Sequence, residues 1–297
     1  GTTSGFNCGK NYTNYHPTAW YLTSIVHPNN DQITFQYSNV GYYYKAGTST
    51  SLLYKLSALN TCPNIAGVTP GQCTPMSNTS CFSWYATSTP VLEEINTSSG
   101  IKLKFSYVDR SDIGDKLVKK IELFQPLSST AIRVFDLNYE EVVATNGQNA
   151  YSTGDASLLY PPFLVQYIER STDGNLHKKH EFVYEDKEAL PARLSYAQDH
   201  YGFYNGALTN NGLIPPPTSE QWKSYFPTAT ANRDANGAFA VKGMLKKIIY
   251  PTGGYDEDVY ESNTVKSRIK VEPAAQEISA FAYTGNRYPG YSTTELS

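Results

Sequence analysis

The sequence has little methionine and no long apolar run, and these two shortages limit the classes of fold that it can adopt. Two methionines stand against 25 tyrosines in 297 residues, a balance that favours strands and amphipathic aromatic surfaces over helix bundles. No apolar run reaches the roughly 18 residues of a membrane-spanning helix, so no membrane span is expected. The 21 glycines and 17 prolines add the chain reversals of a β protein. The composition therefore predicts a mainly β fold.

An excess of positive charge is also missing. The formal net charge is −3 at pH 7, and the paired lysines at 119–120, 178–179 and 246–247 are scattered rather than aligned in a stripe. Nucleic acids and acidic membranes attract proteins with concentrated positive charge. We therefore expect neither of them as a partner.

The first residues, Gly1-Thr2-Thr3-Ser4-Gly5, contain neither an initiator methionine nor the apolar core of a signal peptide. A leading glycine of this kind often remains after removal of a tag. We expect the sequence to be a trimmed piece of a longer protein.

Cysteine is scarce and unevenly placed. Cys62, Cys73 and Cys81 share one stretch rich in Ser, Thr, Pro and Asn, and the remaining cysteine is Cys8. A structural zinc site usually contains a Cys-x-x-Cys pair, which this stretch lacks. The spacing favours disulfides or free thiols over a metal, and one or two disulfides suit an exported protein. No metal or cofactor is expected.

A repeated phrase predicts β-hairpins. Its pattern is Leu-x-x-Ile, a turn rich in Gly, Asn, Asp and Pro, and then alternating apolar residues that end in Phe-x-Tyr. Its copies are expected near residues 20–37, 91–107, 117–139, 163–184 and 244–261, with anchors at Leu22, Leu92, Leu164 and Leu245 in all but the looser third copy. Repeated hairpins with one apolar face each must share a core by stacking side by side. We therefore predict an extended, curved sheet of stacked antiparallel hairpins; the alternative is an ordinary sheet whose hairpins merely look alike.

Longer segments separate these hairpins. The insert at residues 46–90 is predicted to be a surface loop pinned by a disulfide, because it is rich in Ser, Thr, Asn and Pro. One or two short helices are expected near 218–242, with Ser219 as the first cap. Near the end, residues 278–283 have the pattern of a strand. We treat residues 1–297 as a single β-rich module with long loops.

Two phrases of the chain resemble a known family. The first is Leu190-Pro191-x-Arg193-x-Ser195 followed by Asp199-His200-Tyr201-Gly202-Phe203-Tyr204-Asn205-Gly206, and the second is Gly243-Met244-Leu245 followed by Tyr250-Pro251-Thr252-Gly253-Gly254. They are similar to phrases in the large RHS/YD-repeat-type surface or secreted proteins of the Bacteroidetes. The resemblance is specific in residues 190–261 and generic elsewhere.

The resemblance implies a portion of an extended β-sheet assembly, which in this family spirals into a hollow shell around a C-terminal toxin or effector. Two departures matter. Regular Tyr-Asp repeats are absent, with Tyr255-Asp256 as an isolated example, and the family's self-cleaving Asp-Pro-hydrophobic-Gly phrase is absent too. We therefore expect a region N-terminal to the repeat shell, exported to the cell surface or the extracellular space, whose partner is the rest of its own polypeptide.

Asp199-His200 is the most suggestive pair for catalysis, because a carboxylate beside an imidazole can orient a general base. Adjacent residues of a strand, however, point to opposite faces, and no nucleophile stands in a recognisable motif. We expect local roles instead: Asp199 bonds loop amides, and His200 packs among Tyr201, Phe203 and Tyr204.

Further groups of acidic and aromatic residues allow more than one interpretation. Asp109, Asp112 and Asp115 invite a calcium site, but their spacing is not that of an EF-hand, so solvated acids in a hairpin loop are favoured. Residues 256–258 are expected to form a charged edge strand. The aromatic groups at 42–44 and at His200, Tyr201, Phe203 and Tyr204 are candidates for stacking on a glycan, although tyrosines also cover sheet faces.

Three hypotheses of function follow. The first is a non-enzymatic scaffold module of a larger exported RHS/YD-like protein. The second is a cell-surface module that binds a carbohydrate, another ligand or a protein partner. The third is a hydrolase with its site at Asp199-His200.

Overall fold

The computed structural model describes residues 2–6, 19–54, 76–144 and 158–262. Contacts group Gly1–Glu261 into one compact unit, and the chain from Ser262 onward is grouped separately. The predicted strand at 278–283 lies outside the described residues. The same is true of all of residues 263–297, the last part of the predicted single module.

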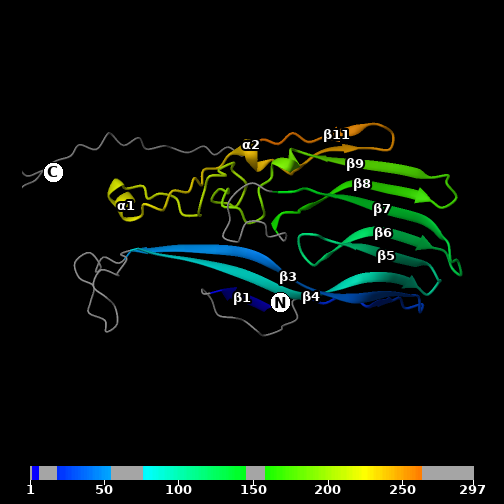
Figure 1. Ribbon diagram of the computed structural model, residues 1–297. Coiled ribbons are helices and arrows are strands. Elements are labelled where there is room, and N and C mark those ends of the chain that lie inside the picture. The colour runs from blue at the N-terminus through cyan, green and yellow to red at the C-terminus, as the bar shows by residue number, and fades with distance from the viewer. Residues whose placement is uncertain (1, 7–18, 55–75, 145–157, 263–297) are drawn as a thin grey trace, which may run out of the picture. The chain divides into compact units, whose positions relative to one another are not determined.

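Within the described part of the first unit, ten strands lie side by side in chain order and form one open antiparallel sheet (Figure 1). They are β2 (Ser24–Val26), β3 (Gln32–Tyr54), β4 (Met76–Thr97), β5 (Lys102–Asp109), β6 (Lys116–Phe124), β7 (Ala131–Glu141), β8 (Pro162–Ser171), β9 (His177–Tyr184), β10 (Leu245–Ile249) and β11 (Tyr255–Glu257). A further strand, β1 (Thr2–Phe6), pairs with β4 away from this path. The predicted mainly β fold of sequential antiparallel hairpins is confirmed, and each expected hairpin coincides with one strand pair.

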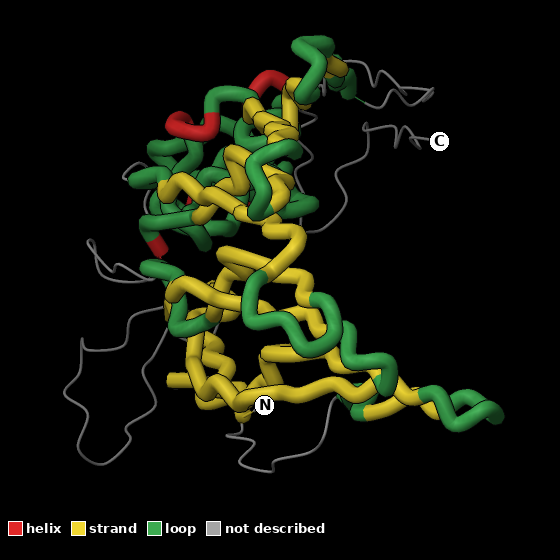
Figure 2. Tube along the Cα trace, turned by 90° about the vertical axis from the view of Figure 1, so that its right-hand side faces the viewer, coloured by secondary structure: helices red, strands yellow, loops and turns green. Residues whose placement is uncertain are grey.

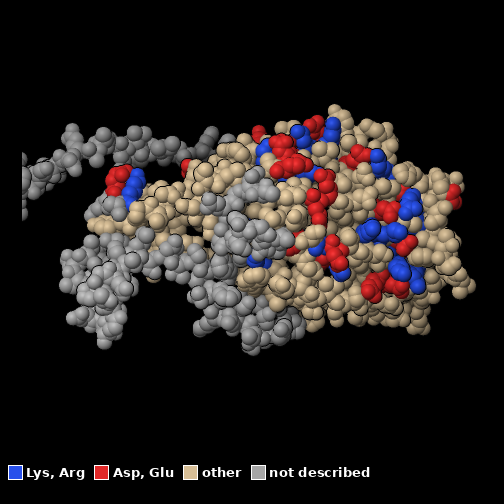
Figure 3. Space-filling view, viewed as in Figure 1, with Lys and Arg blue, Asp and Glu red and all other residues tan. Residues whose placement is uncertain are grey.

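Strand alternation gives the sheet two different faces. Cross-strand register aligns apolar residues on one face, as in the row Phe35, Ile95 and Leu103 and in the row Phe105, Ile121 and Phe135. The neighbouring register aligns Gln36, Glu94, Lys104 and Glu122 on the opposite face. Charged side chains of both signs gather over the strands in the view of Figure 3. The strands therefore have the amphipathic pattern that the alternation predicted.

An aromatic row crosses three neighbouring strands and ends at the turn that follows β10. The ring centroids of Phe135 and Tyr167 lie 6.1 Å apart, those of Tyr167 and His180 5.6 Å, and those of His180 and Tyr250 5.8 Å. Cross-strand aromatic contacts of this kind each stabilise a sheet by about 0.2–1 kcal/mol. The row ties β7, β8 and β9 to the end of β10.

A tyrosine closes the hairpin in several copies of the repeated phrase. In each case its hydroxyl donates a hydrogen bond to the backbone carbonyl of the anchor leucine. The pairs are Tyr37 with Leu22 at 2.9 Å, Tyr107 with Leu92 at 2.5 Å, Tyr184 with Leu164 at 2.7 Å, and Tyr260 with Leu245 at 2.6 Å. We call this contact the tyrosine clamp. Because the same bond recurs at the predicted anchors, it supports true repetition over a chance likeness.

The surface loop predicted over residues 46–90 is wrong for the residues that the structure describes. β3 and β4 continue as one long hairpin, with register from Gly47 opposite Ser83 to Tyr54 opposite Met76. The Ser/Thr-rich composition suggested a loop, but β-branched threonine also fits a strand well. Residues 55–75 lie outside the described part of the chain.

The two ends of the sheet differ in their connections. The five predicted hairpins turn at one end, through residues 27–31, 98–101, 125–130, 172–176 and 250–254. The opposite end carries the extended β3–β4 hairpin and the segment between β9 and β10 (Figure 1). The long excursions are therefore gathered at one end of the strands.

Short helices interrupt the segment between β9 and β10, and Figure 2 shows them in red among the green loops. A 3-10 turn, η3 (Lys187–Ala189), follows β9, and α1 (Glu220–Tyr225) and α2 (Gly237–Ala240) come later. The helices predicted near 218–242 are confirmed. α1 begins directly after Ser219, and Asn236 caps α2 by accepting a hydrogen bond from the amide of Ala238 at 3.1 Å.

Candidate functional site

Residues 190–243, which we call the loop block, form the main irregular region of the described chain. Buried asparagines hold it together: Asn205 donates to the carbonyls of Asn232 and Asp234 at 3.0 and 3.1 Å. Asn210 donates to the carbonyls of Tyr196 and Asn232 at 3.0 and 2.8 Å. These side-chain amides satisfy backbone groups that have no strand partner, which an irregular buried chain requires. The loop block is therefore a packed structure with buried residues of its own.

Asp199 organises a tight turn of the loop block. Its side chain is only 4 % exposed, and Oδ1 accepts hydrogen bonds from the amides of Tyr201 and Phe203 at 2.8 and 3.0 Å. Gly202 completes the turn with φ at +93°. The predicted local role of Asp199 in bonding loop amides is confirmed.

Arg233 braces this turn from the other side of the block. Its Nε and Nη2 donate to the carbonyl of Asp199 at 3.1 and 2.5 Å, and its Nη1 donates to the carbonyl of Leu213 at 2.9 Å. Burial lowers the pKa of the Arg233 guanidinium, and the charge of Asp199 acts in the opposite direction. The guanidinium thus stabilises the turn by donating hydrogen bonds to its backbone.

The predicted ligand-binding residues lie on this turn, but they do not form one surface. Tyr201 is 85 % exposed and Phe203 is 60 % exposed. Tyr204 is half-buried, and the edge of its ring meets Phe239 with centroids 5.4 Å apart. His200 is exposed, so the expected packing of His200 among these rings is wrong. The turn directs His200, Tyr201 and Phe203 outward and uses Tyr204 for internal packing.

The Asp199-His200 pair does not have the geometry of a general base. Asp199 is buried and commits Oδ1 to two backbone amides, whereas the neighbouring imidazole is exposed. None of the hydrogen bonds found in the described chain joins the two side chains. The hydrolase hypothesis has no geometric support at this pair.

The acidic loop between β5 and β6 is occupied by ion pairs. Arg110 donates from Nε and Nη2 to the two carboxylate oxygens of Asp112 at 2.8 and 2.7 Å, and Asp112 is buried rather than solvated. Asp109 pairs with Lys116, and Asp115 accepts from the backbone amide of Lys116 at 2.8 Å. Among the described residues, no group of three or more His, Cys, Asp or Glu side chains is placed to hold a metal ion. The loop is stabilised by these pairs.

The acidic run at residues 256–258 begins in the edge strand β11. Asp256 accepts a hydrogen bond from the hydroxyl of Tyr250 at 2.7 Å. Tyr255, on the other face of the strand, lies under the ammonium of Lys247, 3.6 Å from the ring centroid. The prediction of a charged edge strand agrees with this placement.

The tyrosines at 42–44 divide between the two faces of β3. Tyr42 and Tyr44 stack with ring centroids 6.1 Å apart, and Tyr44 also stacks on Tyr85 at 5.7 Å. Tyr43 is exposed on the other face and contacts Trp84 at 6.0 Å. The stacked pair covers the sheet, as the alternative reading of tyrosine proposed.

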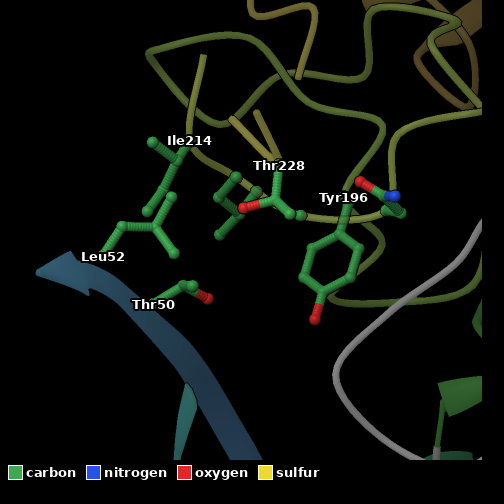
Figure 4. A pocket seen from close by; sticks show the side chains of 8 residues that line it. Thr50, Leu52, Tyr196, Ile214 and Thr228 are labelled. Carbon is green, nitrogen blue, oxygen red and sulfur yellow. The ribbon is translucent and has the colours of Figure 1, made fainter. Parts of the chain in front are cut away.

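A cavity of about 200 Å³ lies between β3 and the loop block, and sequence reasoning missed it (Figure 4). Its lining comes from Thr50, Leu52, Tyr196, Asn211, Gly212, Leu213, Ile214 and Thr228. No signal in the sequence links residues so far apart, because the predicted loop at 46–90 gave Thr50 and Leu52 no defined neighbours. The extended β3–β4 hairpin is what brings them to the loop block.

Three of the four disulfide candidates, Cys8, Cys62 and Cys73, lie outside the described residues. Cys81 lies in β4 with its backbone opposite Ser49. Disulfide formation therefore stays a prediction.

None of the helices in the described chain has the length and apolar character needed to cross a membrane. Comparison with family models, with curated proteins and with solved structures found no match.

Proposed function

We propose that this chain is a non-enzymatic structural module of a larger exported protein of the RHS/YD-repeat type. The observation that carries the proposal is the tyrosine clamp, which recurs at the predicted leucine anchors. A contact that fixes four of the five hairpins in the same way suits an assembly built by adding hairpins to one sheet. The module supplies ten successive strands to that sheet.

The two end strands of the path support continuation of the sheet. In the described chain, β2 pairs only with β3, and β11 pairs only with β10. The β2 edge carries exposed apolar side chains, with Ile25 47 % and Val26 62 % exposed. Exposed edge strands are places where another strand adds. Further hairpins of the same polypeptide are the partner that we propose for these edges.

Hydrogen–deuterium exchange tests this proposal. We would compare the isolated chain with the natural polypeptide extended on both sides. Amides of β2 and β11 that point away from their single partner should exchange at least tenfold more slowly in the longer protein, because strand pairing protects them. Central amides of β6 and β7 are the internal control. Equal exchange at both edges in the two proteins would contradict continuation of the sheet.

A second candidate function is glycan binding at the Asp199 turn, because Tyr201 and Phe203 are large exposed rings on a rigid turn. Aromatic rings offer an apolar face to a sugar. A glycan array probed with the wild type and with Tyr201→Ala/Phe203→Ala tests it. Loss of a bound glycan only in that double variant, and not in Tyr43→Ala, supports binding at the turn. An array without any signal removes this candidate.

A further inference from the structure

We propose that the cavity between β3 and the loop block is a binding site for a small neutral ligand, namely a monocyclic phenol or alcohol. This inference rests on the cavity alone and does not depend on the scaffold function proposed above. Neither the exposed aromatic turn nor the acidic loop contributes a residue to the lining.

One buried hydroxyl of the cavity lining lacks a partner in the described chain, and a second hydroxyl extends toward the same space. The Oγ1 atom of Thr50 is buried and makes no hydrogen bond. Tyr196, which also lines the cavity, is only 8 % exposed, and burial raises the pKa of its hydroxyl. Figure 4 shows Thr50 on β3 and the phenol of Tyr196 on the loop block, extending toward the same space. A buried polar group without a partner costs free energy, so the Thr50 hydroxyl favours a ligand that can bond it, and the Tyr196 hydroxyl offers a second hydrogen bond.

The remaining lining determines the chemical class. Leu52, Leu213 and Ile214 provide aliphatic walls, and the described lining contains no charged side chain. A charged ligand would lose its hydration without gaining an ion pair, which is strongly unfavourable. A wholly apolar ligand would leave the Thr50 hydroxyl unsatisfied. The site therefore fits a neutral ligand with an apolar body and one or two hydroxyl groups.

The volume limits the size of this ligand. An apolar cavity of roughly 150 Å³ is known to hold a benzene molecule. The present cavity, at about 200 Å³, leaves room for a single ring with one or two substituents. It is smaller than the roughly 300–1,000 Å³ of pockets for drug-sized ligands. The site is partly open to solvent, so a monocyclic phenol can enter it directly.

Fluorine NMR with 4-fluorophenol and fluorobenzene as probes tests the site. Wild-type protein should bind 4-fluorophenol about tenfold more tightly than fluorobenzene, because only the phenol can bond the two hydroxyls. Thr50→Val and Tyr196→Phe each remove one hydroxyl and keep the shape. Each should reduce that preference about threefold to tenfold and leave fluorobenzene binding unchanged.

Two controls keep the result interpretable. His200→Ala changes an exposed residue outside the lining and should bind both probes like the wild type. Circular dichroism confirms that every variant is folded. Equal affinity for the two probes, an unchanged preference in both hydroxyl variants, or no binding at millimolar probe would overturn the proposal and leave the cavity as a space for water only.

Discussion

At the scale of single residues, the tyrosine clamp shows a use of tyrosine that composition alone does not reveal. The hydroxyl of Tyr107 satisfies the carbonyl of Leu92, and that of Tyr184 satisfies the carbonyl of Leu164. Both tyrosines are half-buried, so each ring packs on the sheet while its polar end remains bonded. The clamp fixes the end of one strand to the start of its hairpin.

Removing one clamp hydroxyl should weaken the fold measurably. Tyr107→Phe and Tyr184→Phe keep the ring but leave a partly buried carbonyl without its donor. We expect each to lower the free energy of unfolding by about 1 kcal/mol, the usual net value of such a bond. Urea denaturation measures the change. Tyr43→Phe, at an exposed ring, is the control and should stay within about 0.5 kcal/mol of the wild type.

Alkaline pH should act on the same bonds. Burial raises the pKa of the Tyr107 and Tyr184 hydroxyls, with smaller effects of Glu93 and Tyr139 respectively. In the unfolded chain a tyrosine ionises near its ordinary pKa of about 10. The stabilisation from these two groups is therefore complete below that pKa and is lost as pH rises through the raised folded value.

The measurement is thermal unfolding of the wild type and of Tyr107→Phe/Tyr184→Phe between pH 8 and pH 11. The wild type should be the more stable protein at pH 8, and its advantage should shrink toward pH 11. The double variant corrects for all other groups that titrate in this range. An advantage that stays constant across the range would show that the clamp hydroxyls do not ionise differently in the folded state.

The tyrosine clamp also shows which properties of single residues can be predicted from the sequence and which cannot. The leucine anchors and the closing tyrosines were predicted as apolar members of a repeat, and the structure uses them at the same positions. Their hydrogen bond was not predicted, because the acceptor is the backbone carbonyl, and every residue type has one. The outward placement of His200 was missed for a similar reason, since it depends on the Asp199 turn and not on residue type.

At the scale of elements, the loop block depends on a close approach between Gly206 and α2. Gly206 has φ at +78°, and a Cβ atom there would lie 2.5 Å from the ring of Phe239. The same ring packs against Tyr204. The turn of the family-like phrase and the short helix α2 therefore fit together only with glycine at this position.

Gly206→Ala should destabilise the protein clearly. Left-handed strain in a non-glycine residue costs of order 1–3 kcal/mol, and the displaced Phe239 ring adds to this loss. Gly212→Ala is the matched control, because a Cβ there meets no atom within 4 Å. Chemical denaturation of both variants measures the difference. A loss of the same size in both would contradict the close packing of Gly206 on Phe239.

Elements were predictable where periodicity was strong and unpredictable where composition was ambiguous. Alternation in β8 and β9 indicated strands, and the predicted cap at Ser219 indicated where α1 begins. The outer half of the β3–β4 hairpin was predicted as a loop because serine and threonine occur in both kinds of structure. Its pairing is set by the partner strand, which is distant in the sequence.

At the scale of the whole molecule, the apolar edge at β2 should promote association of the isolated chain. Ile25 and Val26 are exposed on a strand with one partner in the described sheet. A lysine on such an edge opposes pairing with another chain. Val26→Lys should therefore lower the associated fraction severalfold in sedimentation velocity. Leu127→Lys adds the same charge at a fully exposed turn and should leave association unchanged.

The cavity illustrates the limit of sequence reasoning at this scale. Thr50 and Tyr196 gain their shared role only because a long hairpin reaches the loop block. Hairpins can be predicted from local patterns, but contacts between distant segments depend on how far each strand extends. That length was the feature that the sequence left ambiguous.

The even number of strands between β2 and β11 has a consequence for how such a chain can change over time. The polypeptide enters the sheet at β2 and leaves it at β11 on the same side, at the end opposite the five hairpin turns. A duplication or deletion of one hairpin unit would keep both junctions on that side and preserve the direction of every remaining strand. A sheet of this design can therefore gain or lose whole hairpin units without reversing any of its strands.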